Sequence, residues 1–107
     1  MRALVAALAL FVSLPAVADP VPREVLAGTY ENCARTNPNS QQHKSFCWCV
    51  ASSIGSDISY QSLMTIDGEM KTAIDRGQRF EVAARSVPEY WRIIQTCRVS
   101  SGMGRLP

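Results

Sequence analysis

The stretch Ser40–Gly55, SQQHKSFCWCVASSIG, predicts the element on which the fold depends. Its apolar residues recur with the i, i+3, i+4 and i+7 spacing of one helix face: Cys47, Val50, Ala51 and Ile54. Ser40 is a favourable N-cap residue, and Gly55 is a favourable residue just beyond a helix end. We therefore expect a helix from Ser40 to about Ile54 with two cysteines in its middle.

The two cysteines of this helix, Cys47 and Cys49, cannot pair with each other. Residues two positions apart point about 200° apart around a helix axis, which is incompatible with disulfide geometry. The remaining pairings are Cys33–Cys47 with Cys49–Cys97, or Cys33–Cys49 with Cys47–Cys97. We favour the first, because Cys33 lies near the turn before this helix and Cys47 is closer to that turn than Cys49.

Helical spacing continues on both sides of this central element. We expect further helices over residues 22–35, from about Ser59 to Gly77, over a short piece at 78–85, and from Ser86 onward. The last helix starts at Ser86-Val87-Pro88-Glu89, which fits a capping box with an early proline. Residues 100–107 are expected to form a frayed tail. The predicted fold class is all-α, a small disulfide-stapled bundle of four to five helices.

Residues 1–18 have the organisation of a secretory signal peptide. A basic residue is followed by the apolar run Ala3–Leu14, by Pro15 and by small residues up to Ala18. This run is shorter than the roughly 20 apolar residues that a membrane-spanning helix needs. We therefore predict cleavage after Ala18, a single helical domain over residues 19–107 without a membrane span, and a periplasmic or secreted location.

The four cysteines have a second possible use, because His43 and Cys47 share a helix face at i, i+4 spacing. They could bind a metal together with another cysteine. The Cys-x-x-Cys pattern of thioredoxin-like redox sites and the Cys-x-x-Cys-His pattern of haem attachment do not occur. An even number of cysteines in a short exported chain favours disulfides. Our first interpretation thus has no metal and no cofactor, and a metal-binding or redox protein is the alternative.

The sequence contains no recognisable catalytic constellation. His43 is the single histidine, and no nucleophile is tied to it by spacing. A small hydrolase would require a cleft that brings His43 to a serine or a carboxylate. We assign no catalytic residue and expect a protein that is not an enzyme.

Trp48 is the first candidate for a partner contact, because its helical neighbours, including Lys44, are polar. The alternative is that the last helix or residues 78–85 cover it. The C-terminal half of the chain is rich in basic residues, among them Arg85 and Arg92, which hints at an acidic protein partner. The alternative is a surface whose charges mix on folding. The net charge of +2 is too small to indicate nucleic-acid binding.

The arrangement Cys33 … Ser45–Val50 … Ile58–Leu63 resembles a pattern in many small exported bacterial helical proteins of unknown function. These have a cysteine in the first helix, an aromatic-Cys-x-Cys helix, a turn rich in serine and tyrosine, and a late cysteine. The resemblance implies a helical, disulfide-bonded, periplasmic protein and carries no activity or site residues. Our leading hypothesis is a non-catalytic interaction module, such as an inhibitor, an immunity-like protein or an envelope accessory protein.

Overall fold

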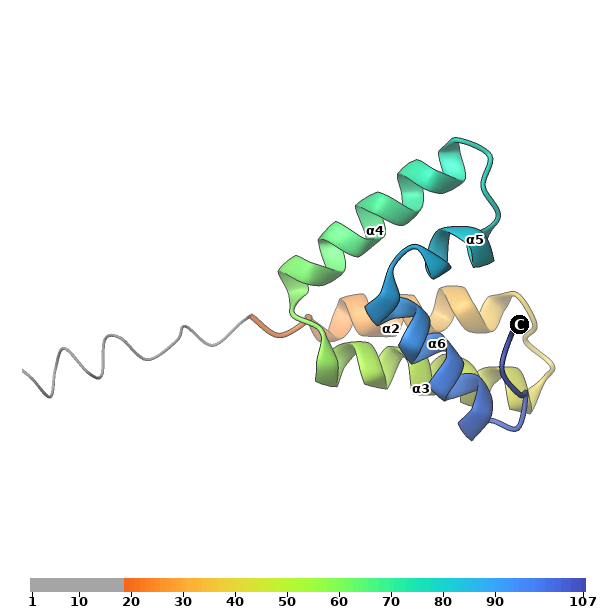
Figure 1. The fold of residues 1–107 in the computed structure, drawn as a ribbon. Helices are drawn as coiled ribbons and strands as arrows, with labels where there is room; N and C mark the ends of the chain where they lie inside the picture. The colour runs from red at the N-terminus through yellow and green to blue at the C-terminus, as the bar shows by residue number, and fades with distance from the viewer. Residues whose placement is uncertain (1–18) are drawn as a thin grey trace, which may run out of the picture.

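The computed structural model describes residues 19–107, so the signal-peptide prediction lies outside the described residues. The described part of the chain forms five α-helices joined by short connections (Figure 1). They are α2 (Arg23–Arg35), α3 (Gln41–Asp57), α4 (Tyr60–Asp75), α5 (Phe80–Arg85) and α6 (Pro88–Ser100). Extended pairing within residues 19–107 is limited to one isolated bridge between Pro20 and Ser59. The all-α prediction is confirmed.

Helices α2 and α3 lie side by side and antiparallel, and α6 packs against α3 (Figure 1). A disulfide joins each pair of helices: Cys33–Cys47 links α2 to α3, and Cys49–Cys97 links α3 to α6. The favoured pairing is confirmed. Because Cys47 and Cys49 point to different sides of α3, the two bonds hold this helix between its neighbours.

Helix α3 begins as predicted and ends later than predicted. The Ser40 hydroxyl accepts a hydrogen bond of 3.1 Å from the backbone N–H of His43. The expected end at Gly55 is wrong, because α3 continues to Asp57. A Cβ atom at Gly55 would lie 2.8 Å from Cδ1 of Leu26 in α2. Gly55 therefore lies inside the helix at its contact with Leu26, where a β-carbon would require the Leu26 side chain to shift, and it does not form a turn.

Helices α4 and α5 form an arm that leads away from the α2–α3 pair and returns to α6 (Figure 1). Helix α4 begins next to Ser59, as predicted; the Ser59 hydroxyl caps it by accepting from the N–H of Ser62, and the helix continues through Gly68. Gly77, with φ of +91°, follows its end. The arm contributes to the core through its buried apolar side chains, Leu63, Ile66, Met70, Ala83 and Ala84.

The capping box predicted at the start of α6 is wrong. The N-cap residue is Val87, and no side chain caps the helix there. Ser86 instead ends α5, where its hydroxyl donates a hydrogen bond of 2.6 Å to the carbonyl of Ala83. Ser86 thus belongs to the end of α5, although the sequence pattern assigned it to the start of α6. Pro88 stands in the first turn of α6 as expected.

The C-terminal segment also differs from the expected frayed tail. Ser100 ends α6, and residues 101–107 have no regular structure but bond to α6. The buried Gln95 side chain donates to the carbonyl of Leu106 and accepts from its N–H, at 2.8 Å in both cases. One turn further, Arg98 donates to the carbonyl of Gly104 at 2.9 Å. The side chains of Gln95 and Arg98 thus form hydrogen bonds with the backbone of the C-terminal segment and hold it against α6.

Removing the Cys49–Cys97 bond should destabilise the protein more than removing Cys33–Cys47. The sequence separations are 48 and 14 residues, so loop-closure entropy gives about 4 and about 3 kcal/mol respectively. Urea unfolding of the two double Cys→Ser variants measures the difference. A larger loss for Cys33→Ser/Cys47→Ser would contradict this ordering.

Gln95→Ala should release the C-terminal segment. Losing two hydrogen bonds at a buried site costs about 1–3 kcal/mol in unfolding free energy, and the Leu106 amide should lose its protection from hydrogen exchange. Gln61→Ala, at an exposed position of α4, is the matched control and should leave both quantities unchanged. Equal exchange at Leu106 in the wild type and in Gln95→Ala would show that the segment is held by something else.

Candidate functional site

Trp48 is the most exposed of the large apolar side chains in the described residues, at 66% of its surface. The alternative expectation, that α6 or residues 78–85 cover Trp48, is wrong. Its ring instead meets Tyr30 of α2 edge-on, with centroids 6.0 Å apart and an interplanar angle of 79°. Because the cysteines on both sides of Trp48 turn toward neighbouring helices, Trp48 itself is directed outward.

The Trp48–Tyr30 pair stands between two surface hollows. The first, which we name the Trp48 groove, has a volume of about 320 Å³ and is lined by Arg23, Leu26, Ala27, Tyr30, Glu31, Trp48, Ala51 and Ser52. The second, of about 310 Å³, is lined by Tyr30, Gln41, Lys44, Ser45 and Trp48. The groove is thus apolar along most of its length. Two side chains of opposite charge, Arg23 and Glu31, line it, and the cationic Lys44 lines the second hollow.

The structure brings together only some of the residues predicted for partner binding. Lys44 lines the hollow beside Trp48, as the helical spacing indicates. Arg85 is held elsewhere: its guanidinium lies 5.1 Å from the ring centre of Trp91 and donates to the carbonyl of Pro107. Arg92 is exposed on α6 and lines neither hollow at Trp48.

Sequence reasoning missed the contribution of α2 to this site. Leu26 and Tyr30 share a helix face with Cys33 by their spacing, but spacing alone does not show that this face contributes to a site. In the structure both are half-buried and line the Trp48 groove. The Cys33–Cys47 pairing could have predicted this contribution, because an antiparallel helix joined to α3 at these residues places Tyr30 beside the middle of α3.

His43 lies against the Cys33–Cys47 disulfide. Its Nε2 atom is 2.8 Å from the carbonyl oxygen of Cys33, 2.9 Å from Oγ1 of Thr36 and 3.4 Å from Sγ of Cys47. A carbonyl oxygen only accepts, so the Nε2 atom carries the proton in this arrangement. No serine hydroxyl and no carboxylate bonds the His43 ring within residues 19–107, so the hydrolase hypothesis gains no support.

The predicted metal alternative corresponds to a real cluster. The ligand atoms of Cys33, His43 and Cys47 all lie within 4.8 Å of one another. A metal is bound by thiolates, and the two sulfurs here are bonded to each other. In the disulfide form these residues therefore fasten α2 to α3.

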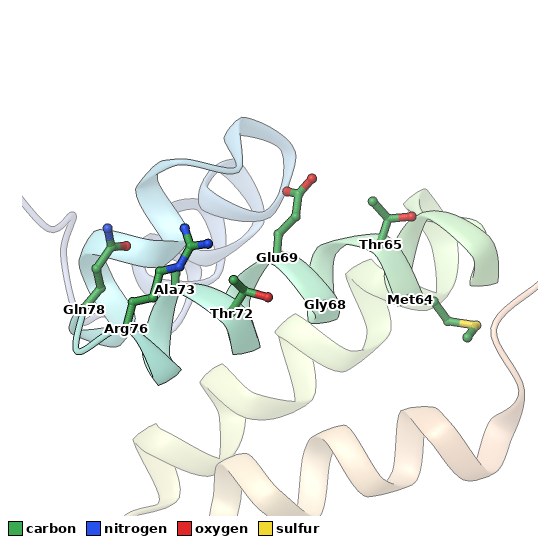
Figure 2. A pocket seen from close by; sticks show the side chains of 8 residues that line it. All are labelled: Met64, Thr65, Gly68, Glu69, Thr72, Ala73, Arg76 and Gln78. Atoms are coloured by element: carbon green, nitrogen blue, oxygen red, sulfur yellow. The ribbon is translucent and has the colours of Figure 1, made fainter.

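A larger open hollow, of about 590 Å³, follows one face of α4 and the turn after it. Figure 2 shows that its lining side chains are distributed along the helix, with Met64 at one end and Arg76 and Gln78 at the other. They do not converge on a common point. This surface brings no set of reactive groups together.

Another hollow lies where α4, α5 and α6 meet. The Tyr90 ring, from α6, packs edge-on against Phe80 at 6.2 Å between centroids. Burial raises the pKa of Tyr90 to about 12, and the negative charge of Asp67 adds to this effect. Partial burial also raises the pKa of Asp67 above its usual value. Both residues line this hollow, which Trp48 does not line.

Comparisons with protein-family models, with curated proteins and with solved structures gave no match to this chain. Within residues 19–107, none of the helices has the length and apolar character that crossing a bilayer requires.

The shifted pKa of Tyr90 predicts a loss of stability at alkaline pH. Below pH 10 the phenol is protonated in both the folded and unfolded chain. Between pH 10 and 12 only the unfolded chain releases the proton, so stability falls as pH rises, by about 2–3 kcal/mol in total.

Tyr90→Phe should remove this part of the alkaline loss, and Asp67→Asn should shift its end to lower pH. Urea unfolding at intervals from pH 8 to pH 12 measures both. Parallel stability profiles for the wild type and Tyr90→Phe would contradict the assignment.

Proposed function

We propose that residues 19–107 form a non-catalytic interaction protein of the periplasm or the secreted space, which binds a protein partner through the Trp48 groove. It would act as an inhibitor, an immunity-like protein or an accessory factor of an envelope assembly. The observation that carries the proposal is the exposure of Trp48, 66% of its surface, beside an apolar groove.

The physical support is the combination of an aromatic anchor with a rigid frame. Tryptophan and tyrosine are enriched among the residues that dominate binding energy at interfaces. Here Trp48 and Tyr30 come from two helices that the Cys33–Cys47 bond joins. Because the frame is fixed before binding, little conformational freedom of the groove is lost when a partner docks.

The lining of the groove favours a particular kind of partner. An apolar side chain of the partner would fit among Leu26, Ala27 and Ala51, against the Trp48 ring. A carboxylate next to that side chain would find Lys44 in the hollow on the other side of the aromatic pair, whereas inside the groove the charge of Arg23 is offset by Glu31. We therefore propose an acidic partner surface with an apolar residue at its centre.

The two disulfides support the proposed location. Such bonds form and persist in oxidising compartments, which include the periplasm and the extracellular space. The proposed export is supported by the signal-peptide pattern in the sequence of residues 1–18.

Photo-crosslinking from inside the groove tests the proposed function. A benzophenone amino acid at Ser52 should give a covalent adduct with a partner in periplasmic extract, whereas the same probe at Thr72 on α4 should not. Trp48→Ala and Lys44→Glu, each combined with the Ser52 probe, should reduce the adduct by tenfold or more. Met64→Ala, at another exposed apolar residue, should leave it unchanged.

The captured partner is then identified by mass spectrometry, purified and titrated against Trp91→Phe protein, in which Trp48 is the remaining tryptophan. Burial of Trp48 should shift its emission to shorter wavelength. Equal adducts from Ser52 and Thr72, or an adduct unaffected by Trp48→Ala, would overturn the proposal.

A further inference from the structure

The cluster of Cys33, His43 and Cys47 is more than a disulfide with a neighbour. His43 and Cys47 lie one turn apart on α3, and Cys33 faces them from α2. All three possible ligand atoms lie within 4.8 Å of one another. Two sulfurs and one imidazole nitrogen are a ligand set typical of zinc.

The spacing of the cluster already approaches that of a tetrahedral zinc site. Zn–S and Zn–N bonds of about 2.3 and 2.0 Å place sulfur and nitrogen ligands roughly 3.5 Å apart, and two sulfurs roughly 3.8 Å apart. Nε2 of His43 and Sγ of Cys47 are 3.4 Å apart. The Cα atoms of the two cysteines are 5.6 Å apart, so side-chain rotation can set the sulfurs at the required separation once they are thiols.

We propose that Cys33, His43 and Cys47 form a redox-gated zinc site: a disulfide in an oxidising environment, and a two-cysteine, one-histidine Zn²⁺ site after reduction. A dithiol reductant supplies two electrons, the Cys33–Cys47 bond breaks, and each sulfur takes up one proton while the dithiol closes to its own disulfide. Zn²⁺ then displaces both thiol protons, and a water molecule completes the four ligands.

His43 changes its role in this step. In the disulfide form its Nε2–H bonds the carbonyl of Cys33 and the hydroxyl of Thr36. In the zinc form the proton moves to Nδ1, and Nε2 binds the metal. The metal then replaces the disulfide as the link between α2 and α3.

The second disulfide has no comparable surroundings. The polar side chains nearest to its sulfurs are two serine hydroxyls, 3.6 Å from Cys49 and 3.7 Å from Cys97. Serine is a poor ligand for zinc beside imidazole and thiolate. Cys49–Cys97 therefore serves as a matched control within the same chain, and the zinc proposal does not depend on the proposed partner binding.

Cobalt(II) binding to residues 19–107 tests the site, because tetrahedral Co²⁺ with thiolate ligands has visible absorption bands and a sulfur-to-metal charge-transfer band. Protein reduced with a phosphine should bind one Co²⁺ with these bands, and added Zn²⁺ should bleach them. Oxidised protein should show none. His43→Ala should weaken binding at least tenfold, and Cys33→Ser/Cys47→Ser should abolish it.

Two further variants separate the site from general effects on folding, which circular dichroism follows in each sample. Cys49→Ser/Cys97→Ser and Thr36→Val should both keep one Co²⁺ with unchanged bands, because neither removes a ligand. Absence of the charge-transfer band in the reduced wild type, with or without loss of helix, overturns the proposal. So does unchanged affinity in His43→Ala, or binding that depends on Cys49 and Cys97 instead.

Discussion

The two-residue spacing of Cys47 and Cys49 on one helix is the constraint on which the rest of the structure depends. Their side chains leave α3 about 200° apart, so one disulfide must reach α2 and the other α6. Together they fix the rotation of α3 about its own axis. Trp48, between them, is then directed to the surface, and His43, one turn before Cys47, is set beside the first bond.

The arm formed by α4 and α5 is held differently. Neither helix carries a cysteine, so the arm is attached by buried apolar side chains such as Leu63 and Ala84, and by the hydrogen bond from the N–H of Tyr60 to the carbonyl of Asp19. Local stability follows the density of such contacts. The cross-linked α2–α3–α6 part should therefore be the more rigid one, which suits a groove made of preset side chains.

Helical periodicity predicted the fold class. The angular geometry of the cysteines excluded a Cys47–Cys49 bond, and the nearness of Cys33 and Cys47 to the intervening turn favoured the observed pairing over the remaining one. The errors have one physical origin, since each concerns a residue whose role is decided by a distant or competing partner. Gly55 has the sequence character of a helix end, but in the structure Leu26 packs on it inside α3. Ser86 was expected to cap α6, but its hydroxyl bonds to α5 instead. The tail looked free because a pattern of spacing cannot show that Gln95 reaches Leu106. At the site, Trp48 and Lys44 could be predicted from their spacing along a single helix. The α2 side of the groove could not, because it depends on the register between α2 and α3.

The groove and the ligand cluster share one covalent bond. Tyr30 stands one turn before Cys33, and Trp48 directly follows Cys47, so the Cys33–Cys47 link also sets the separation of the two aromatic rings. If a partner binds the groove only at that separation, its binding favours whichever form of the sulfur pair maintains it. By reciprocity, a change in that pair must alter partner affinity by the same factor. An open, metal-free dithiol is then the form in which α2 is least constrained and the groove least preorganised.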